Sequence, residues 1–165
     1  MNIRPATSGD REKIWAIIGP VIRDGTTYAV PASMTKEEAL SYWFTDGHDV
    51  FVAEDASAIL GTYYLRANQR GGGNHVANCG YMTSAAARGR GVATRMCEHS
   101  VQHAFARGFR AMQFNFVAST NEGAIRLWQK LGFAIVGRLP LAFRHPAQGF
   151  VDALVMYRQD RKSVV

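Results

Sequence analysis

Apolar and polar residues alternate with two different periods along the chain, and each period predicts a different element. Apolar side chains recur at three- and four-residue spacing from Ile14 to Ile22, which is typical of a helix with one buried face. Thr35 and Glu38 form a capping-box pattern, which predicts a second helix ending near Phe44. Short runs rich in β-branched and aromatic residues, bounded by turn residues, indicate strands. These runs cover residues 2–6, 50–54, 58–66, 75–83, 111–117, 134–139 and 151–158.

In the second half of the chain, strands and helices follow one another in turn. Helices are predicted at residues 91–106 and 122–131, between the last strands. This alternation favours a mixed α/β sheet with helices on its faces. The three glycines at residues 71–73 predict a flexible break. Because no repeat or linker divides the chain, we expect one domain over residues 1–165.

The composition excludes several classes of protein. Hydrophobic residues make up 47% of the chain and charged residues 19%, which is a globular balance and not a disordered one. No apolar run approaches the roughly 20 residues of a membrane span, and the N-terminus lacks the apolar core of a secretion signal. Cys79 and Cys97 are too few for a disulfide framework. We therefore expect a cytoplasmic protein that contacts no membrane, and we assign no metal site.

The net charge of +6 indicates an anionic partner, which could be a nucleic acid or a phosphorylated cofactor. A nucleic-acid module would spread its cations along a stripe, whereas a cofactor site gathers them at one point. Arg88, Arg90 and Arg95 lie in one short segment, which favours a cofactor and no nucleic acid. A basic module whose binding weakens steeply with salt stays the alternative from another class.

Residues 83–94, between a predicted strand and a predicted helix, carry the strongest chemical signal. Gly89 and Gly91 permit backbone conformations that other residues resist, so that successive N–H groups can face one point. The helix that follows adds its free N–H groups and the positive end of its dipole. The segment therefore predicts a pyrophosphate site, although an ordinary glycine-rich turn is the simpler interpretation. Its spacing matches neither a P-loop nor a dinucleotide-binding motif.

Two motifs resemble those of the GNAT superfamily of N-acetyltransferases. Arg88-x-x-Gly91-x-Ala93 is similar to its Q/R-x-x-G-x-G/A signature, and residues 121–133 resemble its N-x-x-A-x-x-L-Y-x-K-x-G-F segment. The resemblance implies a mixed, mostly antiparallel, twisted sheet of about seven strands flanked by about four helices. It also implies that strands four and five splay around acetyl-CoA, the co-substrate. A homodimer is a further expectation at the level of the family.

The resemblance also assigns residues that bind acetyl-CoA. The end of the fourth strand would bind the pantetheine arm through its backbone, and Asn121 would contact the pantetheine or a water bound near it. Trp128 stands where many relatives have the tyrosine that protonates the leaving thiolate, and an indole cannot take over that role at neutral pH. The proton donor is therefore unassigned. The complete set is Tyr81, Met82, Thr83, Arg88, Gly89, Arg90, Gly91, Val92, Ala93, Thr94, Asn121 and Trp128.

A narrower resemblance concerns the acceptor. Residues 75–81, 114–121, 127–133 and 151–153 are similar to the yeast enzymes that acetylate proline analogues such as azetidine-2-carboxylate. The loop at residues 24–28 resembles the acceptor loop of phosphinothricin-type acetyltransferases. Both imply that the acceptor is the amine of a small amino acid or amino-acid analogue. The predicted acceptor-binding residues are Thr26, Thr27, Tyr28, Asn78 and Asn115. The alternatives are another amine (a polyamine, an aminoglycoside or a protein N-terminus) and a non-catalytic acetyl-CoA sensor.

Catalytic roles are predicted for Asn78, Asn115 and His75. Asparagine is disfavoured in strands, and a buried amide without partners costs about 1 to 3 kcal/mol. The two asparagines either bond to neighbouring backbone or hold the acceptor and polarise the thioester carbonyl. His75 is a candidate general base, because imidazole titrates near neutral pH, or else a solvated residue at a strand end. Cys79 is either a nucleophile or a small buried residue, and the second interpretation is favoured.

Overall fold

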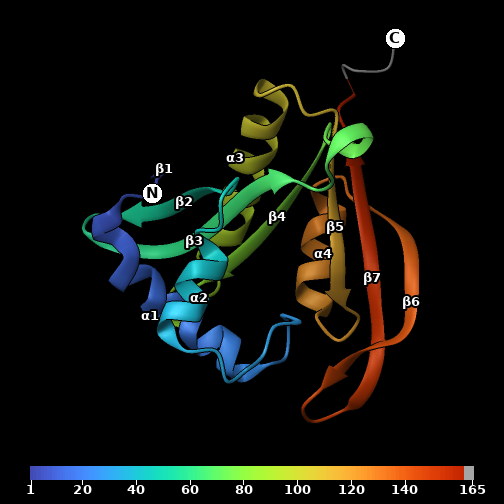
Figure 1. Ribbon diagram of the computed structural model, residues 1–165, viewed down its shortest axis with the longest axis horizontal. Helices are drawn as coiled ribbons and strands as arrows, with labels where there is room; N and C mark the ends of the chain where they lie inside the picture. The colour runs from blue at the N-terminus through green and yellow to red at the C-terminus, as the bar shows by residue number, and fades with distance from the viewer. Residues whose placement is uncertain (162–165) are drawn as a thin grey trace.

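The computed structural model describes residues 1–161, which fold around one seven-stranded sheet (Figure 1). The strands are β1 (Asn2–Pro5), β2 (Asp49–Asp55), β3 (Ala58–Ala67), β4 (Val76–Thr83), β5 (Ala111–Ala118), β6 (Ala134–His145) and β7 (Gly149–Gln159). Their order in the sheet is β1-β2-β3-β4-β5-β7-β6. The pair β4 and β5 is parallel, and the others are antiparallel. The predicted mixed, mostly antiparallel sheet is confirmed.

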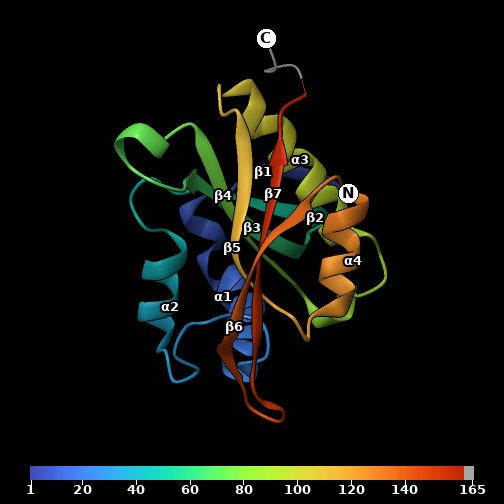
Figure 2. The same cartoon turned by 90° about the vertical axis from the view of Figure 1, so that its right-hand side faces the viewer.

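Four helices cover the two faces of the sheet. They are α1 (Arg11–Asp24), α2 (Lys36–Trp43), α3 (Val92–Ala106) and α4 (Glu122–Lys130). Short 3-10 turns precede α1 (η1, Ser8–Asp10), connect β3 to β4 (η2, Gly71–Gly73) and precede α3 (η3, Ala85–Ala87). In Figure 2, α2 and α4 lie on opposite sides of the sheet. One apolar core contains Met96 of α3 and Trp128 of α4, and a second contains Ile14 of α1 and Trp43 of α2. None of these helices has the length and apolar character that a membrane span needs.

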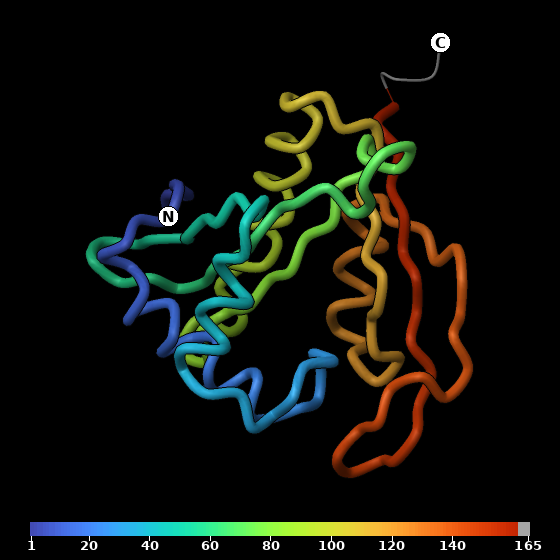
Figure 3. The backbone as a smooth tube through the Cα atoms, in the orientation of Figure 1, coloured from blue at the N-terminus to red at the C-terminus, as the bar shows by residue number. Residues whose placement is uncertain are grey.

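β4 and β5 separate soon after they meet, as the tube in Figure 3 shows. They pair at two positions, Val76 with Ala111 and Ala77 with Met112. At the next position the side-chain amide of Asn78 donates a hydrogen bond of 3.0 Å to the backbone oxygen of Gln113 across the widening gap. β5 also contains a bulge, because its register with β7 shifts between residues 114 and 117. The predicted splay of the fourth and fifth strands is confirmed.

The helix boundaries follow the predicted capping signals. The backbone N–H of Glu38 donates to the Thr35 hydroxyl at 3.2 Å, and the N–H of Thr35 donates to the Glu38 carboxylate at 2.8 Å, so the capping box forms. α1 ends where Gly25 adopts the left-handed conformation with φ 67°. These local signals place the loop at residues 25–34 between two fixed helix ends.

The final hairpin differs most from the sequence-based prediction. β6 continues to His145, six residues beyond its predicted end, and passes through an irregularity between Leu139 and Phe143. Leu141 takes a left-handed φ of 52°, which is unusual for a branched side chain. The carboxylate of Asp152 holds this bend by accepting from the Leu141 N–H at 2.9 Å and from Arg138 at 2.8 Å. This contact with the neighbouring strand lets β6 continue past the bend, so the predicted end at residue 139 is too early.

Candidate active site

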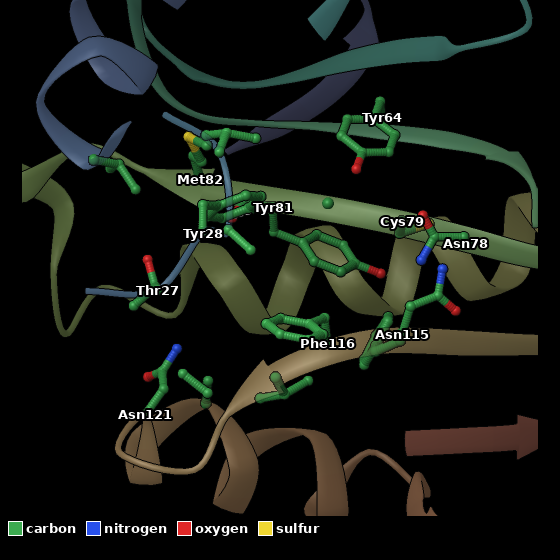
Figure 4. A pocket seen from close by; sticks show the side chains of 18 of the residues that line it. Thr27, Tyr28, Tyr64, Asn78, Cys79, Tyr81, Met82, Asn115, Phe116 and Asn121 are labelled. Carbon is green, nitrogen blue, oxygen red and sulfur yellow. Dashed lines mark hydrogen bonds between the residues drawn. The ribbon is translucent and has the colours of Figure 1, made fainter. Parts of the chain in front are cut away.

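A cavity of about 420 Å³ lies where β4 and β5 separate (Figure 4). Its lining includes Trp128 of α4 on one face of the sheet and Tyr42 of α2 on the other, so the cavity passes through the sheet. A second cavity, of about 490 Å³, lies between the start of α3 and α4. The two share Thr83, Ala93, Ala124 and Trp128 and therefore adjoin. A long ligand could lie along α3 and reach through the gap to the opposite face.

The edge of β4 that faces the gap offers free backbone groups. The N–H of Ser84 donates to the oxygen of Leu60 at 2.8 Å, and β3 and β4 pair without a register shift. Even-numbered residues of β4 therefore turn their backbone polar groups to β3, and odd-numbered ones turn theirs to the gap. The hydroxyl of Tyr28 confirms this orientation by donating to the oxygen of Tyr81 at 2.8 Å. The backbone groups that face the gap are those of Cys79, Tyr81 and Thr83, of which the oxygen of Tyr81 is occupied by Tyr28.

The loop before α3 forms an open cradle for an anion. Gly89 and Gly91 have φ values of 76° and 73°, and an added Cβ at either position would meet nothing within 4 Å. The N–H groups of the first turn of α3 have no acceptor within the helix and point towards its positive end. Left-handed glycines, open space and free N–H groups together suit a pyrophosphate. Arg88 also lines the second cavity, whereas the Arg90 side chain pairs with Asp55 at 2.8 Å.

Trp128 lines both cavities with an apolar ring. Its ring centroid lies 5.2 Å from that of Tyr81 and 5.2 Å from that of Phe114, and the side chain is buried. An indole in this position packs against a ligand but has no proton to give near neutral pH. Compared with a tyrosine at this position, Trp128 therefore provides an apolar contact surface but no proton donor.

On the α1 and α2 side, tyrosines form the wall of the first cavity. The hydroxyls of Tyr42 and Tyr64 lie 3.2 Å apart, and burial raises the pKa of Tyr64 and Tyr28 well above the usual value for a phenol. These groups are neutral and act as hydrogen-bonding contacts. Gly80 makes room for them, because an added Cβ would lie 2.6 Å from the Tyr64 ring.

The two predicted asparagines meet at the narrow end of the cavity, one from each diverging strand (Figure 4). The side-chain oxygen of Asn78 accepts from Nε of Arg66 at 3.2 Å, and its amide nitrogen bonds to Gln113. Asn115 accepts from the Gln113 side chain at 2.9 Å and donates to Asn68 at 2.7 Å. Each amide is therefore positioned by protein contacts. Each also keeps one N–H for which the described residues supply no acceptor, and this N–H is available to a ligand.

The structure brings together most, but not all, of the predicted site residues. Every predicted acetyl-CoA residue lines one of the two cavities except Arg90, and every predicted acceptor residue lines the first except Thr26. The Thr26 hydroxyl instead donates to Asp24 at 2.5 Å. His75 is exposed on the turn before β4 and lies outside both cavities. The cavity therefore forms without the three side chains Arg90, Thr26 and His75.

Sequence reasoning missed several lining residues. Tyr64 and Phe116 read as ordinary strand residues, and Tyr42 could equally have been core. Arg66 left one signal, because a cation is unusual in the otherwise apolar strand of residues 58–67. The sequence of this strand does not predict which residues surround Arg66 in the folded protein.

Charged groups are scarce at the first cavity. Among its described lining residues, Arg66 is the one charged side chain, and there is no aspartate, glutamate or histidine. Burial raises the pKa of the Cys79 thiol, which keeps it protonated and unsuited to act as a nucleophile. Residues 1–161 also contain no group of three or more potential ligands that could hold a metal ion.

Comparison with known proteins agrees with this geometry. Residues 20–133 match the Acetyltransferase (GNAT) family, and the chain belongs to it. The chain is similar to the N-acetyltransferase aca1 of Schizosaccharomyces pombe, with 28% identity over 81% of this chain and 72% of that protein. It is also 27% identical to YwnH of Bacillus subtilis, provisionally named a phosphinothricin acetyltransferase, over 85% of this chain and 88% of that one.

Solved structures share the whole fold. A GCN5-related N-acetyltransferase from Kribbella flavida is 40% identical and superposes with a TM-score of 0.92 over 96% of this chain and 97% of that one. A phosphinothricin acetyltransferase from Sinorhizobium meliloti in complex with acetyl-CoA is 22% identical, with a TM-score of 0.83 over 96% of this chain and 87% of that one. The protein is an N-acetyltransferase that uses acetyl-CoA as co-substrate.

Proposed function

We propose that this N-acetyltransferase acetylates the amine of a small amino acid or amino-acid analogue. The observation that carries the proposal is the lining of the first cavity on the α1 and α2 side. There, neutral tyrosines and amides surround one guanidinium, Arg66, with no carboxylate among the described lining residues. A polyamine or an aminoglycoside would enter this cavity without a single counter-charge. The similarity to YwnH, whose name gives the amino-acid analogue phosphinothricin as acceptor, supports the same acceptor class.

In the proposed reaction, the two substrates approach from opposite faces of the sheet. The pyrophosphate of acetyl-CoA lies against the Gly89 and Gly91 loop, and the pantetheine arm pairs with the free edge of β4. The acceptor lies among the tyrosines on the other face. Binding holds the amine beside the thioester carbonyl, which replaces a bimolecular encounter by one fixed geometry.

The acceptor nitrogen attacks the carbonyl carbon, a C–N bond forms, and the C–S bond breaks to release the thiolate of coenzyme A. The developing oxyanion accepts hydrogen bonds from backbone N–H groups of β4 that face the gap, namely those of Cys79 and Tyr81. The free N–H groups of Asn78 and Asn115 orient the acceptor. Trp128 packs against the pantetheine arm.

Protons move through water in this mechanism. The amine must be neutral to attack, yet the described lining of the first cavity has no side chain that titrates near neutral pH. Water at the cavity mouth therefore takes the proton of the amine. Water also returns a proton to the thiolate, because Trp128 cannot.

The experiment that tests the proposed function is mass spectrometric detection of product from acetyl-CoA and a panel of amines. The panel contains azetidine-2-carboxylate, proline, phosphinothricin, methionine sulfoximine, spermidine, kanamycin and a short peptide. We expect acetylation of amino acids or their analogues, and none of spermidine or kanamycin. Acetylation restricted to the cationic amines or the peptide would refute the proposal. Binding of acetyl-CoA without any product would favour the sensor.

We also propose that two copies associate through β6. This strand forms one edge of the sheet, and edge strands offer unpaired backbone groups to a second strand. Val136 and Leu141 on β6 are 60% and 63% exposed, and Phe150 on β7 is 65% exposed. Two identical edges can cover one another about a two-fold axis. Sedimentation should show a dimer for the wild type and a monomer for Val136→Glu. The control Gln69→Glu, at an exposed site away from β6, should remain a dimer. A wild type that is monomeric at all concentrations would contradict the proposal.

A further inference from the structure

We propose that Arg66 binds the carboxylate of the acceptor, which makes the enzyme selective for α-amino acids over amines that lack an acid group. This inference rests on the proposed function and narrows it to one kind of acceptor. The site consists of the Arg66 guanidinium, the Asn78 amide that positions it, and the adjoining tyrosine wall of Tyr42 and Tyr64.

The backbone places Arg66 on the acceptor face of the sheet. Arg66 on β3 pairs in register with Asn78 on β4, and Tyr64 pairs with Gly80. Residues two apart on a strand share a face, and so do paired residues on neighbouring strands. Tyr64 belongs to the core against α1 and α2, so Arg66 and Asn78 face the same side. The guanidinium thus lies at the acceptor end of the cavity, away from the pyrophosphate loop.

One edge of the guanidinium is fixed and the other is free. Nε of Arg66 donates to the side-chain oxygen of Asn78 at 3.2 Å, and the amide nitrogen of Asn78 is held in turn by Gln113. The described residues provide no hydrogen-bond acceptor for the two terminal nitrogens of Arg66. Two parallel N–H groups on a fixed plane are the geometry that a carboxylate accepts best.

The charge of Arg66 has no partner within the described part of the chain. Arg4, Arg90 and Arg138 each form an ion pair with a carboxylate, whereas Arg66 forms none although its side chain is partly buried. Arg66 acts electrostatically on two titratable groups of this side, Tyr64 and His48, whose rings are stacked with centroids 4.2 Å apart. The His48 imidazole gives no negative charge. An uncompensated, partly buried cation at a cavity wall favours an anionic ligand.

The same placement brings the amine to the reacting position. In an α-amino acid, the carboxylate and the amine are separated by one carbon atom. A carboxylate on Arg66 therefore holds the amine close to Asn78, at the end of the cavity where β4 and β5 begin to separate. A diamine without a carboxylate would have no such anchor.

The test compares an acid with its amide. Wild type, Arg66→Gln, Arg66→Lys and the control Arg70→Gln are assayed with azetidine-2-carboxylate, phosphinothricin and their α-carboxamides. Arg70 suits as a control because it is exposed on the turn after β3 and lines neither cavity. We expect Arg66→Gln to raise KM for the acids by about 50-fold, with KM for acetyl-CoA unchanged. Arg66→Lys should fall between, because it keeps the charge without the paired N–H groups.

Each alternative outcome has a distinct meaning. Equal use of acids and amides by the wild type would overturn the role of Arg66 and leave the proposed function intact. Equal losses for acid and amide in Arg66→Gln would show that Arg66 acts only by positioning Asn78. Acetylation of spermidine but of no amino acid would overturn both proposals. An unchanged KM for acetyl-CoA also demonstrates that the variant is folded.

Discussion

The two sides of the cavity are built in different ways. On the α3 and α4 side, one contiguous segment presents backbone N–H groups, and its two glycines leave open space in front of them. On the α1 and α2 side, the surface consists of side chains from α2, β3, β4, β5 and the loop after α1. In the proposed function, the surface on the α3 and α4 side recognises features common to every acyl-CoA, whereas the surface on the α1 and α2 side fits one class of acceptor. Backbone recognition tolerates changes of side chain, but acceptor recognition depends on each of them.

The largest expected effect comes from Gly91→Glu on the acetyl-CoA side. A glutamate at φ 73° is strained, and its carboxylate would stand where the pyrophosphate binds. We expect a loss of acetyl-CoA affinity of at least about 100-fold, measured by calorimetry. Gly108→Glu is the matched control, because Gly108 has φ 91°, also has open space around it, and lies beyond the other end of α3. Unchanged affinity in Gly91→Glu would show that the pyrophosphate site is misplaced.

The next effect concerns the asparagines, which belong to the acceptor side. Asn78→Ala and Asn115→Ala should each lower kcat/KM for the best acceptor by about 10- to 50-fold and leave acetyl-CoA affinity unchanged. Steady-state kinetics with both substrates varied separates the effect on the acceptor from the effect on acetyl-CoA. Asn74→Ala, at an exposed turn position, should behave as wild type. Full turnover in both cavity variants would refute the role of these amides.

A smaller effect is expected from Gly80→Ala. The added Cβ would meet the Tyr64 ring at 2.6 Å, so the ring must move into the acceptor space. We expect KM for the acceptor to rise about 10-fold without a comparable change for acetyl-CoA. Gly72→Ala, where nothing lies within 4 Å, serves as the control in the same kinetic assay. An equal rise for both substrates would mean that the two sides are less independent than their construction indicates.

The smallest expected effect is that of His75→Gln on the pH profile. Without a titrating side chain among the described lining residues, kcat/KM should increase about tenfold per pH unit below the pKa of the acceptor amine and then level off. The midpoint should move when an acceptor with a different amine pKa is used. His75→Gln should leave this profile unchanged, because His75 is exposed outside the cavity. A limb that disappears in His75→Gln would instead establish His75 as the base.

Local patterns predicted the elements well. The capping box at Thr35 and Glu38 follows from short-range chemistry, and it is present. The end of β6 could not be predicted in the same way, because the bend at Leu141 depends on Asp152 from the neighbouring strand. The local sequence indicates where a strand can end, but pairing with the neighbouring strand determines where it does end.

The candidate site likewise has one part that local sequence predicts and one part that it does not. Arg88-x-x-Gly91-x-Ala93 is a contiguous signal, because a loop followed by a helix start uses its own backbone, and the structure places that segment at a cavity. The acceptor surface has no such signal. Tyr42, Tyr64 and Arg66 come from separate segments, and sequence alone gave no reason to choose them over other aromatic or basic residues.

The chain therefore encodes its glycine loop, its helices and its strands through interactions between residues close in sequence, and its motifs indicated the separation of β4 and β5 through the resemblance to a known family. Only the packing of the sheet determined that Asn78 links the two strands across the gap, and that Arg66 faces the cavity without a counter-charge. The physical reason is the separation along the chain of the residues that interact. Backbone conformation and capping depend on neighbours a few residues away, whereas burial, charge and the fit of a ligand depend on side chains that meet only after folding.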